Sequence, residues 1–372
     1  MGKFGRKHSI DMNPLSYNFC LLGSPGVGKT TLIYQLCEKL VGSEGYIHFD
    51  IASERAVDAI EGIVSEPIED YDKMVEVIDD IVENKDTDYP NLKVVVWDTL
   101  DMLIPLCEAQ AVKLWNRKNP DKKGDTILSV WGGFGRGNDK AMELFVNEMN
   151  RLRNVGVNSI IIGHVKRSET IDPISQETYS RLTADTQQRY FNAIRNQMDI
   201  VAIAYIDRNI VTEKLNRKDI KGNVLTTNKV TSEARVISFR DDSFAVDSKS
   251  RFHCIVDKIP LDCDAFIKAV QDAIIAEKSK SGKSEAEIKK EQTARDKAAA
   301  KAASEYSKSA KENKIDLDRN EEIIAIIKEK FTSATEEIQT AVKEKMTEVG
   351  LKNFKDTEVP TESLEAVLAV ME

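Results

Sequence analysis

Short apolar runs alternate along this chain with longer stretches in which apolar residues keep helical spacing. Runs with the length and composition of buried strands are NFCLL (18–22), KVVVWD (93–98), SIIIG (159–163) and DIVAIAYI (199–206). The stretch YDKMVEVIDDIVE (71–83) is amphipathic with the period of a helix that crosses between two strands. Continuous apolar strands are typical of parallel sheets that helices cover on both faces. The pattern therefore predicts an α/β fold with a mostly parallel sheet flanked by helices.

The composition of the chain changes near residue 277. Residues 278–314 are mostly Lys, Glu, Ala and Ser, which is typical of an extended linker or a solvated helix. After residue 315 apolar spacing returns in three short segments that could form a small bundle, and fourteen acids there outnumber seven cations. The 372 residues exceed what one core usually organises. We expect a flexible N-terminal segment (1–17), the α/β domain (18–276), a charged linker (277–314) and a small acidic helical module (315–372).

A phosphate-binding loop is the most specific feature of the sequence. Residues 23–30 read GSPGVGKT, which matches the pattern G-x-x-x-x-G-K-[ST] between a predicted strand and a predicted helix. Its glycines let successive backbone N–H groups point at phosphate oxygens, and the helix directs its positive end at the same anion. Lys29 reaches the β and γ phosphates, and Thr30 offers its hydroxyl to Mg²⁺. The candidate residues for binding ATP are Gly23, Ser24, Pro25, Gly26, Val27, Gly28, Lys29, Thr30 and Thr31.

A second acidic position completes the predicted nucleotide site. Asp98 ends an apolar strand, where it is expected to hold Mg²⁺ directly or through water together with Thr30. Many ATP motors place a catalytic glutamate immediately after this aspartate, but Thr99 stands there. The base must then come from another strand, and the candidates are Asp50 and Glu54, which follow the β-like run GYIHF and begin a stretch (50–60) with helical spacing. The alternative for Glu54 is a first-turn acid that only stabilises a helix.

A basic segment rich in aromatic residues lies between two predicted helices. Residues 116–138 read NRKNPDKKGDTILSVWGGFGRGN, and the cations from 113 to 140 outnumber the acids by seven to three. Trp115, Trp131 and Phe134 are interleaved with these cations. Cations for the backbone and rings for the bases are what a single-stranded DNA surface requires. The alternative is a solvated loop whose tryptophans pack underneath it.

Two further positions are candidates for the reaction. His164 follows the strand 159–163, and polar residues at the carboxyl ends of parallel strands face the crevice where such sheets bind ligands. His164 is therefore a candidate sensor of the γ phosphate, and a structural histidine is the alternative. The run 168–188 after it is polar and is predicted to be irregular.

The overall composition excludes some classes of protein. Net charge is −9 at pH 7, which argues against general coating of nucleic acid but not against a local basic groove. The sequence shows no apolar run of membrane-spanning length and no apolar core of a signal peptide near its start. Its five cysteines are odd in number and form no C-x-x-C pair, so reduced thiols in a cytoplasmic protein are expected, in the host cytoplasm if a phage encodes the protein.

The order of these parts resembles the core of the RecA recombinases over residues 18–275. The resemblance is carried by GSPGVGKT, by Glu54 after its strand, by VVVWDT without an adjacent glutamate, by IIIGH followed by cations, and by DIVAI. The pattern is most similar to phage-encoded RecA-like ATP-binding proteins of the AAA class, including the Sak-type single-strand annealing proteins. It implies that Glu54 polarises the attacking water and that His164 stands where the family has a γ-phosphate-sensing glutamine. Residues 116–138 and 167–187 would be the two DNA-facing loops.

The same resemblance implies a homo-oligomer with ATP bound between protomers. Lys249 and Arg251 would match paired cations that reach into the ATP site of a neighbour. If residues 248–251 form a strand, alternation places both cations on one face, suited to meeting a phosphate. The alternative is a salt bridge to Asp241, Asp242 or Asp247.

The sequence thus predicts a RecA-like P-loop ATPase that acts on single-stranded DNA in recombination or annealing. The rival from a different class is a nucleotide-dependent loader or scaffold for replication partners, in which contact with DNA is incidental. The basic aromatic segment favours the first function. The acidic module, as a possible site for a protein partner, favours the second.

Overall fold

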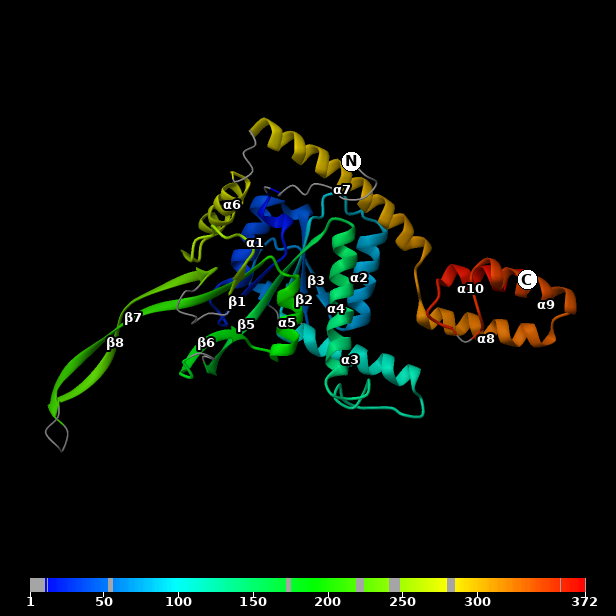
Figure 1. Ribbon diagram of the computed structural model, residues 1–372, viewed down its shortest axis with the longest axis horizontal. Helices are drawn as coiled ribbons and strands as arrows, with labels where there is room; N and C mark the ends of the chain where they lie inside the picture. The colour runs from blue at the N-terminus through cyan, green and yellow to red at the C-terminus, as the bar shows by residue number, and fades with distance from the viewer. Residues whose placement is uncertain are drawn as a thin grey trace.

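The computed structural model describes residues 11, 13–52, 56–171, 175–218, 224–240, 248–279, 285–354 and 356–371. Within these ranges ten strands form one sheet with the order β10-β8-β7-β1-β5-β4-β2-β3, with β6 paired to β5 and β9 to β7 (Figure 1). The strands are β1 (Phe19–Gly23), β2 (Tyr46–Ile51), β3 (Ser65–Ile68), β4 (Val94–Asp98), β5 (Asn158–Ile171), β6 (Thr178–Ala184), β7 (Ile200–Lys218), β8 (Val224–Ser238), β9 (Lys249–Ser250) and β10 (Lys258–Pro260).

Helices cover both faces of this sheet. The helices of the described chain are α1 (Lys29–Leu40), α2 (Tyr71–Glu83), α3 (Leu100–Lys118), α4 (Arg136–Asn154), α5 (Gln188–Gln197), α6 (Cys263–Ser279), α7 (Glu285–Glu312), α8 (Leu317–Ser333), α9 (Glu336–Glu348) and α10 (Thr361–Leu368), and those that cover the sheet are α1 to α6. Short 3₁₀ turns occur at Pro14–Ser16, Ser43–Gly45, Ala56–Ala59 and Ala369–Met371.

The six central strands, from β3 to β7 in the sheet order, all run parallel. Alternate residues of each strand point to opposite faces. Cys20 and Leu22 of β1 therefore enter one apolar core with α2, α3, α4 and α5, whereas Phe19 and Leu21 enter a second core with α1 and α6. The predicted α/β fold with a mostly parallel sheet flanked by helices is confirmed.

Some predicted boundaries and elements are wrong. The basic segment 116–138 is shorter than expected, because α3 continues to Lys118 and α4 already begins at Arg136. The region 167–187 is not an irregular loop, since β5 and β6 pair as an antiparallel hairpin from Val165↔Ala184 to Ile171↔Thr178. This hairpin tolerates polar residues because most of its side chains remain accessible to solvent. The helical spacing from residue 50 is overridden by β2, which continues to Ile51.

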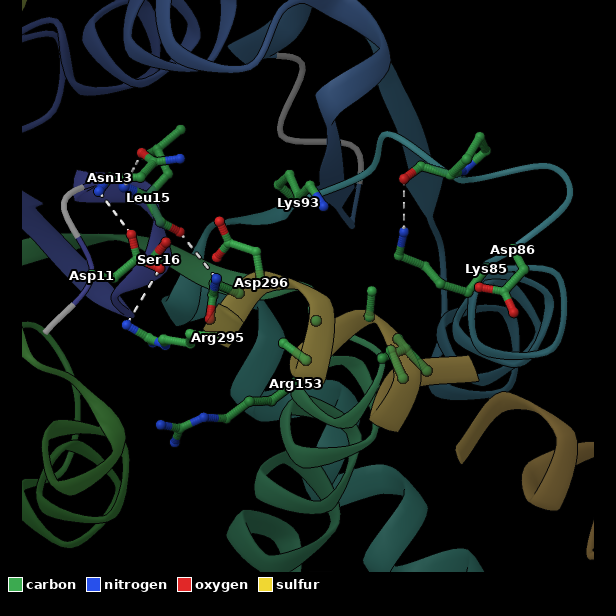
Figure 2. Close-up of a pocket in the computed structure, with 17 residues that line it drawn as sticks. Asp11, Asn13, Leu15, Ser16, Lys85, Asp86, Lys93, Arg153, Arg295 and Asp296 are labelled. Atoms are coloured by element: carbon green, nitrogen blue, oxygen red, sulfur yellow. Dashed lines mark hydrogen bonds and ion pairs between the residues drawn. The ribbon is translucent and has the colours of Figure 1, made fainter. Parts of the chain in front are cut away.

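The described part of the N-terminal segment packs against the domain. Leu15 is buried, and the Asn158 side chain donates to its carbonyl oxygen at 3.1 Å. A cavity of about 640 Å³ lies between this segment, the turns that precede β4 and β5, and α7 (Figure 2). Its buried Lys85 donates to Tyr89 O at 2.7 Å, and burial together with the charge of Lys93 lowers the pKa of Lys85 to about 8. The residues just before 18 therefore pack against the α/β domain.

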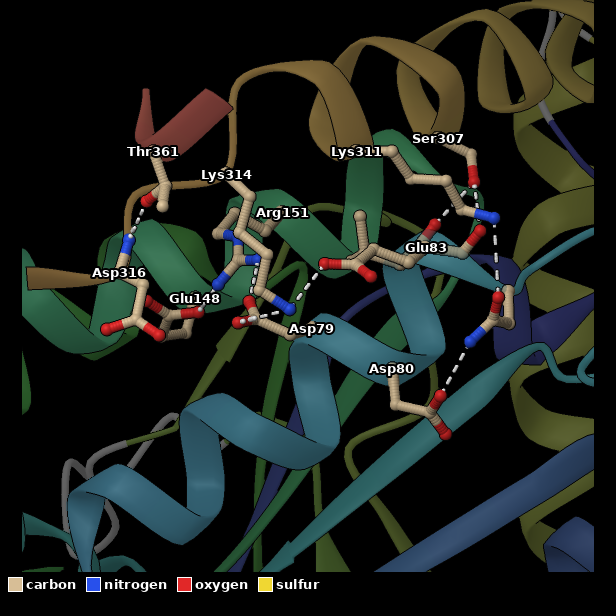
Figure 3. Close-up of polar contacts among 12 residues, drawn as sticks. Asp79, Asp80, Glu83, Glu148, Arg151, Ser307, Lys311, Lys314, Asp316 and Thr361 are labelled. Carbon is tan, nitrogen blue, oxygen red and sulfur yellow. Dashed lines mark hydrogen bonds and ion pairs between the residues drawn. The ribbon is translucent and has the colours of Figure 1, made fainter. Parts of the chain in front are cut away.

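The predicted linker contains one long helix that packs on the domain. α7 crosses the C-terminal end of α2, and the buried hydroxyl of Ser307 is 2.5 Å from Val82 O (Figure 3). Lys314, just after α7, pairs with Glu83 at 2.7 Å and with Asp79 at 3.6 Å. Of the two alternatives for this segment, the structure shows a helix, and one of its faces is covered.

The acidic module contains the three predicted short helices. α8, α9 and α10 enclose a separate small core of Ile323, Ile324, Ile327, Val342, Met346, Leu351, Leu364 and Val367. Arg117 at the end of α3 pairs with Asp318 and Glu321 of α8, and Lys118 pairs with Glu358 at 2.6 Å. Cations from the predicted DNA surface thus join the module to the domain.

Candidate functional site

The phosphate loop connects the carboxyl end of β1 to the start of α1. Gly26 and Gly28 have φ angles of +71° and +107°, which side chains rarely adopt. At Gly23 the constraint is contact, because a Cβ there would lie 2.5 Å from Ala204 O of the neighbouring β7. The glycine spacing of the motif therefore follows from two backbone conformations and one close approach.

Lys29 lies inside this loop, and Thr30 faces the next acidic position. The Lys29 ammonium donates to Gly23 O at 3.0 Å and Ser24 O at 3.1 Å, and the residue is buried. The Thr30 hydroxyl donates to Asp98 Oδ2 at 2.8 Å, which joins α1 to the end of β4. These contacts bring the phosphate-binding lysine, the hydroxyl and the strand-end carboxylate together.

Asp98 has one satisfied oxygen and one unpaired oxygen. Its Oδ2 also lies 3.0 Å from His48 Nε2, whereas Oδ1 is buried without a hydrogen-bond partner. A hydroxyl and an unpaired carboxylate oxygen fit Mg²⁺, which usually takes one or two carboxylates plus phosphate oxygens and water. No group of three or more His, Cys, Asp or Glu that could hold a metal occurs among the described residues, and a Mg-nucleotide site does not need one. Thr30 and Asp98 are therefore the residues that would hold the ion.

His48 is a site residue that the sequence did not reveal. It is fully buried on β2, and its contact with Asp98 joins residues 50 positions apart. A histidine within a strand gives no recognisable motif, and only the β2–β4 pairing brings it to the aspartate.

Only one of the two candidate bases, Asp50, lies within the part of the chain that the structure describes. Glu54 lies outside the described residues. Asp50 is buried on β2 and is the register partner of Asp98 in β4. Asp50 is thus at the carboxyl edge of the sheet, on the strand next to Asp98. The choice between the two carboxylates stays a prediction.

His164 lies at the same edge, beside the phosphate loop. It is the register partner of Gly23, and its Nδ1 is 2.5 Å from Asp101 Oδ2 in the first turn of α3. The backbone N–H of His164 donates to the same oxygen at 3.2 Å, and Asp101 Oδ1 is buried without a partner. Asp101 therefore holds both the ring and the backbone of His164 at the base of the β5–β6 hairpin. The sequence did not single out Asp101, although its place three residues after Asp98 is a weak signal.

Lys249 and Arg251 have partners in their own chain. The Lys249 ammonium donates to Arg195 O at 2.7 Å and Met198 O at 2.9 Å at the end of α5, and burial with the charge of Arg251 lowers its pKa. Arg251 pairs with Asp199 at 3.1 Å. Both cations lie beside the amino end of β7, whereas the phosphate loop is at the carboxyl end of the neighbouring β1, so the structure does not bring them to the phosphate loop of their own chain.

The basic segment between α3 and α4 exposes an aromatic ring on a constrained backbone. Phe134 is 99% exposed, and Trp131 and Phe134 both have positive φ angles, of 60° and 51°. Trp131 packs on Trp115 and lies under the Lys140 ammonium. Part of each alternative is therefore present, because the tryptophans pack while Phe134 remains outside.

A phosphate loop, a facing strand-end aspartate and a parallel sheet define a P-loop nucleotide-binding protein. A family model described as an AAA domain matches residues 16–252, which is more than half of the chain. The chain therefore belongs to the AAA domain family, whose members are P-loop ATPases. No curated protein matches it in sequence. In the described part of the chain, no helix has the length and apolarity needed to cross a membrane.

Among solved structures, the chain is similar to the flagellar accessory protein FlaH from Methanocaldococcus jannaschii. The identity is 9%, the TM-score is 0.27, and the match covers 63% of this chain and 89% of that chain. So low a TM-score supports no statement about function.

Proposed function

We propose that this protein binds and hydrolyses Mg-ATP at its phosphate loop and couples the nucleotide to single-stranded DNA in recombination or annealing. The nucleotide part follows from the family and from the cluster of Lys29, Thr30 and Asp98. The DNA part rests on the surface between α3 and α4, where Lys122, Lys123 and Phe134 are exposed. Neither lysine has an ion-pair partner among the described residues. In this proposal the protein acts as the phage-encoded RecA-like proteins do, a group that includes the Sak-type annealing proteins.

The single observation that carries the DNA proposal is Phe134. A fully exposed phenylalanine with positive φ costs free energy in the isolated protein, and such strain is usually kept at functional sites. Stacking on a base contributes about 1–3 kcal/mol per base and needs no defined sequence. The exposed ring of Phe134 offers a surface on which a base can stack, and the two lysines offer positive charges for the DNA backbone. The β5–β6 hairpin, which replaces the expected loop 167–187, is proposed as the second DNA contact.

Fluorescence anisotropy with a labelled thymidine oligonucleotide tests this surface. Phe134→Ala should weaken binding at every salt concentration, because stacking does not depend on counterions. Lys122→Ala with Lys123→Ala should instead flatten the salt dependence, by about 0.7 in slope for each lost phosphate contact. Lys328→Ala with Lys343→Ala, two exposed lysines of the acidic module, is the matched control. Unchanged affinity in both loop variants would reject the DNA surface.

The proposed assembly is a homo-oligomer with ATP between protomers, in which Lys249 and Arg251 face the nucleotide of a neighbour. The exposure of Arg251, at 56% of its side chain, leaves part of the guanidinium accessible beside Asp199. Protein with Arg251→Ala is mixed with protein with Lys29→Ala, each inactive alone. Recovery of hydrolysis would support the trans arrangement. No recovery at any ratio, with assembly of mixed oligomers verified, would restrict the cation to its own chain.

A second candidate is a nucleotide-dependent loader or scaffold for a protein partner. The observation that favours it is the pairing of Arg117 and Lys118 with the acidic module, which removes two cations from the proposed DNA surface. If single-stranded DNA changes neither ATPase rate nor particle shape in electron micrographs, this second function is preferred.

A further inference from the structure

Arg235 of β8 approaches the phosphate loop from the side opposite Asp98. In the sheet, β5 and β4 lie on one side of β1, and β7 and β8 lie on the other (Figure 1). A Cβ placed on Gly28 would be 3.9 Å from Arg235 Nη1 and 3.2 Å from Leu261 Cδ2. Leu261 is fixed beside this arginine, because its N–H donates to Arg235 O at 2.9 Å. An arginine and a leucine from the β8–β10 edge therefore contact the loop.

Within the described residues, the charge of Arg235 has no acidic partner. Its side chain is exposed, and it makes no hydrogen bond or ion pair among the described residues. Two other cations of these strands are paired: Arg208 lies 3.3 Å from Glu233, and Lys258 lies 2.9 Å from Asp207. The unpaired charge is close to Gly28, the N-cap of α1, where the helix already presents its positive end. Two positive potentials at one place are unfavourable unless an anion binds between them.

The sheet order indicates which part of the nucleotide would lie there. Lys29, Thr30 and Asp98 mark the β- and γ-phosphate end, and Asp98 lies on the β4 side of the loop. A nucleotide whose terminal phosphate faces β4 and β5 has its α phosphate and nucleoside on the other side of the loop. That side is formed by Gly28, Arg235 and Leu261.

We propose that Arg235 is a nucleotide-binding residue in its own chain. Its guanidinium donates to phosphate oxygens at the nucleoside end of bound ATP or ADP, and Leu261 forms an apolar wall beside them. The proposal rests on the nucleotide-binding part of the proposed function and is independent of DNA.

Direct binding of fluorescent ADP, with competition by ATP, ADP and AMP, tests this assignment. Arg235→Ala should weaken ADP and ATP about tenfold, which is about 1.4 kcal/mol and corresponds to one charge-assisted hydrogen bond. Arg235→Lys should recover part of the affinity, and Arg235→Glu should lose more than Arg235→Ala. The control is Arg208→Ala, which removes a paired arginine of the neighbouring strand β7. This variant should bind nucleotide as the wild type does.

The outcomes separate the two proposals. If the wild-type protein and Lys29→Ala bind ADP equally weakly, the nucleotide site itself is rejected. If the wild type binds ADP and Arg235→Ala binds it with the same affinity, only the role of Arg235 is overturned. If Arg208→Ala loses as much affinity as Arg235→Ala, the role of Arg235 is also overturned, since the effect would then come from the total positive charge of β7 and β8. Because Arg235 is exposed, the melting temperature of each variant should match the wild type, and this verifies the fold.

Discussion

Single side chains at the carboxyl edge of the sheet determine what the nucleotide site can do. Lys29 and Thr30 begin α1, Asp98 ends β4, Asp101 lies in the first turn of α3, and His164 lies within β5. Thr99 stands where a catalytic glutamate often follows the Mg²⁺ ligand. Under the proposed function we therefore expect a carboxylate from another strand to activate water, and two variants decide between the candidates.

Glu54→Gln should keep ATP binding and slow hydrolysis by roughly 10²-fold or more, the effect of losing a general base. Asp50→Asn should leave most of the activity, because Asp50 is buried within β2. Steady-state ATPase rates and nucleotide affinity are measured for both. The reverse result, with Asp50→Asn inactive and Glu54→Gln active, would identify Asp50 as the base.

We expect Asp101 to act through His164, the predicted sensor of the γ phosphate, as a positioning residue. Asp101→Asn keeps the shape of the side chain but removes the charge that orients the His164 ring. We expect kcat to fall about tenfold, the effect of losing a charge-assisted hydrogen bond, with KM for ATP nearly unchanged. The control is Asp139→Asn. It removes the charge of an acid near the start of α4 that pairs with Arg189 of α5. A change in KM alone would contradict the positioning role.

At the scale of elements, α7 is the part whose role differs most from its composition. Residues 285–312 are rich in Ala, Lys and Glu, yet Ala303 is buried and Tyr306 packs partly buried against the main core. The Ser307 hydroxyl and Lys314 join this helix region to α2 (Figure 3). Small side chains allow close approach of two helices, so a composition typical of a solvated helix also permits packing.

Ser307→Ala should weaken the docking of α7 by about 1 kcal/mol, the usual net contribution of a hydrogen bond. Amide hydrogen exchange is the measurement, and it should become faster in α7 while the central strands remain protected. Lys308→Ala, which truncates an exposed side chain on the same helix with no ion-pair partner among the described residues, should change nothing. Equal exchange in both variants would mean that the Ser307 contact does not hold the helix.

At the scale of the whole molecule, the acidic module and the proposed DNA surface share the same cations. Arg117 contacts Asp318, Glu321 and the carbonyl of Leu317, and Lys118 pairs with Glu358. Exposed ion pairs of this kind are individually weak. A phosphate backbone with many charges can therefore compete with the module for them.

Neutralising the module side of these pairs should strengthen binding of single-stranded DNA. The variant Asp318→Asn, Glu321→Gln, Glu358→Gln releases two cations, which should steepen the salt dependence by about 1.4 in slope, or 0.7 per phosphate contact. The control Glu336→Gln, Glu337→Gln, Glu344→Gln removes the same charge from exposed positions of the module. Anisotropy titrations compare the two. An equal effect in both would reflect net charge alone, and not release of Arg117 and Lys118.

The sequence by itself determined the features that depend on neighbouring residues. The phosphate loop was predictable because its glycines, lysine and threonine act within eight positions, and Asp98 because it ends a continuous apolar strand. The periodicity of residues 71–83 and of the three short helices of the module was likewise local. The α/β class followed from these elements.

Only the tertiary structure decided contacts between distant parts of the chain. His48 meets Asp98 across 50 residues, His164 meets Asp101 across 63, and Arg235 reaches Gly28 from β8. Each depends on strand order, which short-range spacing does not specify. The same holds for the hairpin at 165–184, where backbone pairing overrides a polar, irregular pattern, and for Lys249 and Arg251, whose partners come from α5 and Asp199. Local patterns thus establish which groups are available, and the sheet order determines which of them meet.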